Sequence, residues 1–398
     1  MVVIYLDNSA TTKVRPQVLE AMLPYLSESY GNPSSIHSLG RSARAAVDNA
    51  RNQVASFLGC LPSEVYFSSC ATMSNNVALL GRARFVEANG LPKHLITSTI
   101  EHPAVFGPAQ YLEAQGWRVS YLPVDREGFV SLSDFEKALD ADTSIVSVMW
   151  GNNEIGVLEP VEAMAEMVEN HSKSLGRDIF MHTDAVQIPG KLPIDLCQLK
   201  VSALSLSGHK FGAPKGIGIL FLRRLFNIMP IIFGGGQEMG MFAGTESVAH
   251  IVAIGEAARL AQQEQIELEK RLRSYQKQLF ERLLALDIDL TITGPRDITK
   301  RLPGHVSFSV NGIEGEALVL KSDLKGLALS SGSACHQGII EASSVLKAIG
   351  LGQAKALGAV RITFGADNSD SDVAESIRLL EQILGKVRRA MKIENGHN

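Results

Sequence analysis

Hydrophobic and polar positions alternate along the chain in patterns typical of helices and of buried strands. Between residues 41 and 58 apolar side chains recur at Val47, Ala50, Val54 and Phe57, which is a helical spacing. Short apolar runs that predict strands cover residues 65–68, 94–100, 119–124, 144–150, 178–184, 201–207 and 217–222. From residue 41 to residue 242 this alternation predicts an α/β domain built on a parallel sheet with crossover helices.

Polar segments follow most of these predicted strands directly. They read CATM, EHPAV, GNNEIG, DAVQ and SGHK. Because ligands of open α/β sheets bind beyond the carboxyl ends of the strands, these segments predict a polar site along one edge of the sheet.

A long helix-prone stretch, residues 247–286, is expected to connect this domain to a smaller α+β domain. We predict a large domain over residues 14–260 and a small domain over residues 1–13 and 261–398. The short tail after Met391 is expected to be frayed.

Composition narrows the class of function. The 398 residues are 45% apolar, enough for a large core, and 38 Lys plus Arg against 42 Asp plus Glu give a net charge of −4. With no basic block, the chain is not expected to bind nucleic acid or an anionic membrane. No signal-like N-terminus and no apolar run long enough to cross a bilayer are present, so we expect a cytoplasmic protein acting on a small molecule. The four scattered cysteines predict neither a disulfide framework nor a metal site.

Lys210 and Asp184 are the strongest candidates for chemistry. Lys210 follows a predicted strand and precedes a glycine-rich segment, where partial burial would lower its pKa and make it nucleophilic toward an aldehyde. Asp184 ends the preceding strand candidate, and a carboxylate there would keep a pyridine nitrogen protonated. The ordinary alternatives are a solvated lysine and an aspartate that caps a helix.

A phosphate group needs backbone amides at a helix N-terminus with hydroxyl groups beside them. Ala71 and Thr72 open a helix-prone segment directly after residues 65–68, and Ser207 and His209 flank the lysine. For each position alone, an ordinary helix cap or turn residue is the alternative.

Cys335 lies in the segment SSGSACHQG, which predicts a mobile loop of small residues. Such a loop argues for a mobile, reactive thiol rather than a buried, inert one. Cys60 and Cys197 are predicted to be buried and inert, and Cys70 to pack under the phosphate-binding turn.

The chain resembles the cysteine desulfurases, which are fold-type I pyridoxal phosphate (PLP) enzymes of the class V aminotransferase group. The matching segments are YLDNSATT at 5–12, GNPSSIHSLG at 31–40, ATMSNN at 71–76, EHPAV at 101–105, NNEIG at 152–156, HTDAVQ at 182–187, SGHKFGAPKGIG at 207–218, GGGQE at 234–238, GT at 244–245 and SSGSAC at 330–335. The resemblance implies a large domain with a mainly parallel seven-stranded sheet between helices. It also implies a PLP-dependent reaction that takes sulfur from L-cysteine and gives L-alanine and a Cys335 persulfide.

The same resemblance assigns roles to single residues. Lys210 becomes the Schiff-base lysine, Cys335 the sulfur-accepting nucleophile and His102 a proton carrier stacked on the cofactor ring. Arg361 would bind the substrate carboxylate, with Asn153 near that carboxylate and the ring hydroxyl. The implied cofactor-binding positions are Ala71, Thr72, His102, Asn153, Asp184 beside the pyridine nitrogen, Gln187 at the ring hydroxyl, Ser207, His209, Lys210 and Thr245.

Partners also follow from the resemblance. Thr245 would reach the phosphate of a neighbouring subunit, which implies a homodimer. The sulfur would pass to an acceptor protein, such as an iron–sulfur scaffold or a thiolation carrier.

The chain departs from the family pattern at a few positions. Met73 replaces the usual glutamate, and Met239 and Phe242 replace two usual arginines, so positive charge near the site entrance is reduced. Two alternatives stay open: a selenocysteine lyase or other PLP-dependent carbon–sulfur lyase, and a catalytically silent scaffold subunit of a sulfur-transfer complex.

Overall fold

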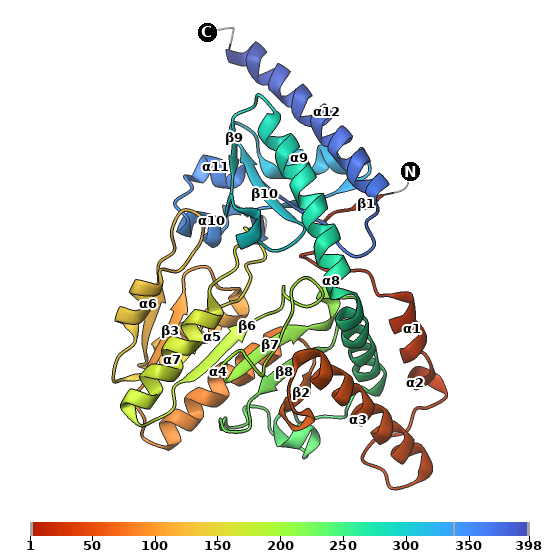
Figure 1. Ribbon diagram of the computed structural model, residues 1–398, viewed down its shortest axis with the longest axis vertical. Helices are drawn as coiled ribbons and strands as arrows, with labels where there is room; N and C mark the ends of the chain where they lie inside the picture. The colour runs from red at the N-terminus through yellow and green to blue at the C-terminus, as the bar shows by residue number, and fades with distance from the viewer. Residues whose placement is uncertain (1–2, 337–338, 396–398) are drawn as a thin grey trace.

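The computed structural model describes residues 3–336 and 339–395, with side chains described outside residues 333–341 and 387–395. A seven-stranded sheet of order β2-β8-β7-β6-β5-β3-β4 forms the centre of the larger part (Figure 1). Its strands are β2 (Val65–Ser68), β3 (His94–Ser98), β4 (Arg118–Leu122), β5 (Thr143–Ser147), β6 (Phe180–Asp184), β7 (Ala203–Ser207) and β8 (Gly218–Leu222). Strand β8 runs antiparallel to both of its neighbours, β2 and β7, and the other pairs in this sheet are parallel. The predicted fold class is therefore confirmed, with a mixed rather than fully parallel sheet.

Helices cover both faces of this sheet, as near-continuous apolar strands require. One face packs against α3 (Ser38–Leu58), α6 (Leu132–Ala138), α7 (Val161–Leu175) and the first half of α8 (Val248–Ala285). The other face packs against α4 (Ala71–Ala88) and α5 (Pro103–Ala114). Side chains alternate between the two cores, with Val146 and Leu204 on the first face and Ile145 and Ala203 on the second.

Helix α8 runs from the larger part into the smaller one (Figure 1). Its 38 residues confirm the helix predicted over residues 247–286. The second half of α8 contributes Leu272, Leu279 and Leu283 to a separate core that also contains Leu6 and Phe308. Shorter helices of the larger part are α1 (Pro16–Met22), α2 (Pro24–Ser27), η1 (Pro62–Glu64), η2 (Gly208–Lys210) and η3 (Gln237–Gly240).

The smaller part is built on a four-stranded antiparallel sheet of order β12-β15-β10-β9. Its strands are β9 (Leu290–Ile292), β10 (His305–Val310), β12 (Ser330–Ser331) and β15 (Ala359–Thr363). The N-terminal strand β1 (Ile4–Tyr5) pairs with β11 (Leu327–Ala328), so the first residues lie with the C-terminal part. The helices here are η4 (Ile298–Lys300), α9 (Gly315–Asp323), α10 (Ser344–Ala348), α11 (Gln353–Leu357) and α12 (Asp370–Asn395). The domain bounds given above stay a prediction.

Two local predictions are wrong. Helix α12 continues to Asn395, so the chain is not frayed directly after Met391. The segment around Cys335 is not a loop, because β13 (Ser333–His336) pairs antiparallel with β14 (Ile339–Ala342), with Cys335 opposite Ile340. The side chain of Cys335 lies outside the described residues.

Candidate active site

A cavity of about 250 Å³ lies beyond the carboxyl ends of β5, β6 and β7. Five separate segments line it, covering residues 70–75, 102–104, 149–153, 184–187 and 207–210. These segments bring together most of the residues predicted for the site, namely Ala71, Thr72, His102, Asn153, Asp184, Gln187, Ser207, His209 and Lys210. The edge of the sheet at which the strands end thus forms a polar cavity, as expected for an open α/β sheet.

Lys210 closes the turn after β7 and points its amine at the N-terminal segment. Its Nζ donates to the carbonyl oxygens of Ser9 at 2.6 Å and Ala10 at 2.7 Å. Burial and the positive charge of Arg361 lower the pKa of Lys210 to about 8, although Asp7 and Asp184 oppose the shift. A minor fraction of this amine is therefore uncharged near neutral pH, far more than for an ordinary lysine, and only the uncharged form is nucleophilic.

Asp184 ends β6, the strand next to β7, and faces the same cavity. Its Oδ2 accepts a hydrogen bond from Asn75 Nδ2 at 2.7 Å, and its Oδ1 accepts from the backbone N–H of Val186 at 3.1 Å. Asn75 is fully buried, and its Oδ1 has no partner within the described part of the chain. Sequence reasoning assigned no role to Asn75, although it is a polar residue three positions after Thr72, on the buried side of α4.

His102 caps the N-terminus of α5 and also lines the cavity. Its Nδ1 accepts from the backbone N–H of Ala104 at 3.1 Å, so the neutral ring carries its proton on Nε2. Burial lowers the pKa of His102, with Lys210 acting in the same direction and Asp184 against it. A neutral imidazole is therefore available beside the cavity, and its Nε2–H has no hydrogen-bond partner in the part of the chain that the structure describes.

Glu101, the residue before His102, ties the ends of β3 and β5 together. Its Oε1 accepts from Ser98 Oγ at 2.6 Å and from the backbone N–H of Met149 at 2.9 Å. Burial raises the pKa of Glu101 to about 8. Sequence reasoning did not single out this carboxyl group, which supports the wall of the cavity in its protonated form.

The N-terminal segment after β1 forms a second layer beneath the lysine. The carbonyl oxygen of Ser9 accepts from Gln187 Nε2 at 3.0 Å as well as from Lys210. Thr11 Oγ1 lies 3.1 Å from His209 Nδ1, and the backbone N–H of Thr12 donates to the carbonyl oxygen of His209 at 2.8 Å. The sequence motif at residues 5–12 therefore has a physical role, which is to fix the residues around the lysine.

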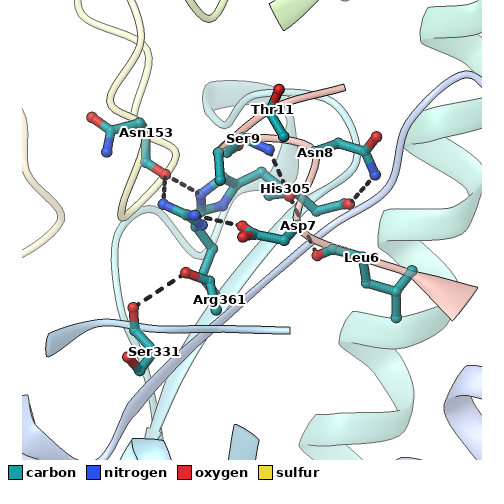
Figure 2. Close-up of polar contacts among 12 residues, drawn as sticks. Leu6, Asp7, Asn8, Ser9, Thr11, Asn153, His305, Ser331 and Arg361 are labelled. Atoms are coloured by element: carbon teal, nitrogen blue, oxygen red, sulfur yellow. Dashed lines mark hydrogen bonds and ion pairs between the residues drawn. The ribbon is translucent and has the colours of Figure 1, made fainter. Parts of the chain in front are cut away.

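Arg361 comes from β15 and is not among the residues that line the cavity. Its Nη2 donates to Asp7 Oδ1 at 2.6 Å and its Nη1 to the carbonyl oxygen of Asn153 at 2.9 Å. Figure 2 shows Asp7 and Asn153 meeting the guanidinium from two sides, with His305 Nε2 3.4 Å from the same Asn153 oxygen. Arg361 is thus held next to the cavity through Asn153, which lines it.

Thr245 is exposed and does not line the cavity of its own chain. The cysteine predictions are wrong in three details. Cys197 is exposed and Cys60 half-buried, although burial still raises the pKa of Cys60 to about 12. Cys70 precedes the first residue of α4 and lines the cavity itself.

Comparison with known proteins identifies the class and then the family. The aminotransferase class-V family matches residues 4–375. The cysteine desulfurase IscS of Dictyoglomus turgidum is 42% identical over 388 residues, covering 97% of this chain and 95% of that protein. A solved NifS-like protein shares the fold with a TM-score of 0.89 at 38% identity, covering 97% of this chain and 100% of that one. SspA, solved in complex with cysteine, has a TM-score of 0.77 at 33% identity and covers 90% and 98%.

The fold, with its cavity at the strand ends, is therefore that of a class-V aminotransferase-type enzyme. The chain belongs to the cysteine desulfurases of this family. Within the described residues, the structure contains no helix long and apolar enough to cross a membrane.

Proposed function

We propose that this chain binds PLP at Lys210 and transfers the sulfur of L-cysteine to Cys335, releasing L-alanine. The observation that carries the proposal is the placement of Asp184 and Lys210 in one cavity: Asp184 ends β6, and Lys210 closes the turn after the neighbouring parallel strand β7. The class-V aminotransferases use PLP, and SspA, a relative, has been solved in complex with cysteine.

The residues around the cavity fit PLP. Cys70, at the start of α4, makes no side-chain cap, which leaves the first N–H groups of this 18-residue helix available to a phosphate. Ala71, Thr72 and Ser207 line the cavity there. His209 also lines the cavity, but burial lowers the pKa of its imidazole to about 4 and keeps the ring neutral. The helix N-terminus, rather than a charged side chain, would therefore supply most of the attraction for the phosphate.

The remaining cavity residues would hold the other groups of the cofactor. Lys210 would carry the aldehyde carbon, Asp184 would pair with the pyridine nitrogen and His102 would stack on the ring. Gln187 would contact the ring hydroxyl. When bound, PLP supplies an electron sink for the negative charge that develops at the substrate α-carbon.

Protein groups would then bind the substrate and move its protons. Arg361 offers a planar fork for the substrate carboxylate, with Asn153 beside it. Lys210, whose pKa is about 8, would take the α-proton as a general base. His102, with a free N–H on Nε2, would return a proton to the product.

Cys335 would accept the sulfur. Its thiolate forms an S–S bond with the substrate sulfur as the C–S bond breaks, and the electron pair of that bond stays with the carbon, which gains a proton. The products are L-alanine and a Cys335 persulfide, so no external oxidant or reductant is needed. Cys335 lies five residues after Ser330, which pairs with Arg361 across β12 and β15, so its segment begins beside the proposed carboxylate site.

The sulfur acceptor and the oligomeric state are further parts of the proposal. We expect a thiolate-bearing acceptor protein, such as an iron–sulfur scaffold or a thiolation carrier. Thr245, exposed in its own chain, would contact the phosphate in the second subunit of a homodimer. Sedimentation of the PLP-loaded protein would test the dimer, and Thr245→Ala is expected to weaken PLP binding.

One experiment tests the central reaction. The PLP-loaded protein is incubated with L-cysteine, alanine is quantified, and the persulfide is located by mass spectrometry. Cys335→Ala should keep the yellow cofactor but form no persulfide, whereas Cys197→Ala, which removes an exposed thiol, should behave as wild type. Undiminished turnover in Cys335→Ala would contradict the role of this cysteine, and a wild-type protein that takes up no PLP would contradict the proposal as a whole.

A further inference from the structure

Lys191 is a buried lysine that none of the proposed steps uses. The residue is 7% exposed, and no ion pair of Lys191 occurs among the described residues. Gly190, with a φ of 72°, turns the chain just before it. This turn brings the amine back onto Gln187, where Nζ donates to the carbonyl oxygen at 3.2 Å and to Oε1 at 3.0 Å.

The contact with Lys191 fixes the direction in which the Gln187 amide faces. Oε1 accepts from Lys191, and Nε2 donates one of its two hydrogens to the carbonyl oxygen of Ser9 at 3.0 Å. A flipped amide would place the NH₂ group against the amine of Lys191 and the oxygen against the carbonyl of Ser9. The observed orientation leaves the second hydrogen of Nε2 for the cavity that Gln187 lines.

The same contacts connect Lys191 to the catalytic lysine. Ser9 O accepts from both Gln187 Nε2 and Lys210 Nζ, so Lys191, Gln187, Ser9 and Lys210 form one continuous network. Burial, together with the charges of Lys210 and Arg361, lowers the pKa of Lys191 to about 7. A neutral amine still has two N–H groups, enough for both bonds to Gln187, so the orientation of the amide persists in either charge state.

We propose that Lys191 is a positioning residue: it holds the Gln187 amide so that an N–H group faces the ring hydroxyl of bound PLP. This inference rests on the proposed function, because Gln187 contacts the ring hydroxyl only if PLP occupies the cavity. Without Lys191 only the hydrogen bond to the Ser9 carbonyl holds the amide, and rotation of the amide would present its carbonyl oxygen to a deprotonated ring oxygen, which it repels. An N–H donor stabilises the deprotonated ring oxygen. Loss of this donor therefore raises the pH at which the bound cofactor changes colour.

The test uses two measurements on PLP-loaded protein: the dissociation constant of PLP and the pH midpoint of its visible absorption. Lys191→Met, which keeps the aliphatic stem, should raise the dissociation constant about tenfold, the effect of one lost hydrogen bond. It should also move the midpoint upward by about half a pH unit or more. Lys200→Met, at an exposed position nearby, is the matched control and should change neither value.

A double-mutant cycle separates positioning from a general structural role. In a Gln187→Met background, Lys191→Met should have no further effect on either quantity, because Lys191 acts only through the amide. The inference would be overturned if Lys191→Met left the pH midpoint and the PLP affinity unchanged. It would also be overturned if Lys191→Met had the same effect in the Gln187→Met background as in the wild-type background. If Lys191→Met does not fold, Lys191→Gln, whose shorter side chain cannot reach both acceptors, replaces it. A wild-type protein without PLP would instead refute the proposed function.

Discussion

Arg361 Nη2 and Asp7 Oδ1 lie 2.6 Å apart and join two segments separated by 354 residues. The two side chains are only 10% and 20% exposed, so water screens this ion pair weakly. Asp7 follows the N-terminal strand, and Arg361 lies on β15 of the small sheet. The pair therefore fixes the proposed carboxylate-binding fork relative to the segment that contacts Lys210.

Replacing Asp7 by alanine should loosen this fork. The guanidinium of Arg361 then keeps only its hydrogen bond to the backbone carbonyl of Asn153, among the described residues, and is less well oriented. KM for L-cysteine should therefore rise about five- to tenfold, while kcat changes less. The free energy of unfolding should fall by about 1–3 kcal/mol because a partly buried charge loses its partner. Steady-state kinetics and denaturant titration measure both effects.

Asp48→Ala is the control for that change. Asp48 pairs with Arg44 at 3.9 Å on an exposed helix surface, so its loss should alter stability by less than about 0.5 kcal/mol and leave KM unchanged. An unaltered KM in Asp7→Ala would show that Asp7 does not orient Arg361 for the substrate.

The lowered pKa of Lys210 predicts the pH dependence of cofactor attachment. Only the uncharged amine attacks an aldehyde, so the rate at which cofactor-free protein acquires PLP should rise with pH and level off above about 8. Arg361→Gln removes a positive charge that lowers this pKa, and it should move the plateau to higher pH. Stopped-flow absorbance between pH 6 and 10 gives both profiles. Lys215→Met, at an exposed position, should match wild type; a plateau reached only near the ordinary lysine pKa would contradict the prediction.

Asn75 and Asn76 offer a matched pair on one helix. Asn75→Ala removes a 2.7 Å hydrogen bond to the carboxylate of Asp184, and hydrogen bonds to charged groups contribute about 1.5–3 kcal/mol. Stability should fall by about that amount, and PLP affinity should fall because Asp184 loses the donor that orients it. Asn76 donates only to the carbonyl of Thr72 near the surface, so Asn76→Ala should change stability by less than about 1 kcal/mol. Equal effects of the two changes on PLP affinity would argue against a role for Asn75.

Local pattern was enough to predict the sheet and the long helix. All seven strands of the large sheet lie within or beside the predicted apolar runs, because buried strands are continuous apolar segments. Nine residues expected at the site line one cavity, because the ends of parallel strands meet at one edge. Their individual roles, several of which rest on the family resemblance alone, stay predictions. What the pattern could not provide was pairing over long distances, such as Asp7 with Arg361 or Asn75 with Asp184.

The errors have a similar origin. The segment SSGSAC has low intrinsic strand propensity, yet residues 333–336 form a strand because residues 339–342 pair with them. Cys197 was expected to be buried, but Leu196 and Leu199 take the buried positions of that turn and leave the thiol outside. The burial of Glu101 was not predicted, because nothing in a single sequence distinguishes a buried carboxyl group from an exposed one.

Glu101 gives the last prediction, which concerns stability and pH. Burial raises its pKa in the folded protein to about 8, above the ordinary value of 4.5 that the unfolded chain retains. Between these two values the folded state binds one more proton than the unfolded state, so this group makes stability fall as pH rises, by up to about 1.4 kcal/mol per pH unit. The contribution is fully present below pH 4.5 and lost as pH passes through about 8. Glu101→Gln should remove this slope.

The glutamine keeps an oxygen to accept from Ser98 and Met149, so its fold should be preserved. Glu159, whose pKa burial also raises to about 8, should maintain a slope of the same sign in the variant. Urea titrations at intervals from pH 5 to pH 8 should therefore show a shallower loss of stability with pH in Glu101→Gln than in wild type. Parallel curves for the two proteins would mean that Glu101 is already ionised in the folded state, and its proton would then not contribute to the stability of the cavity wall.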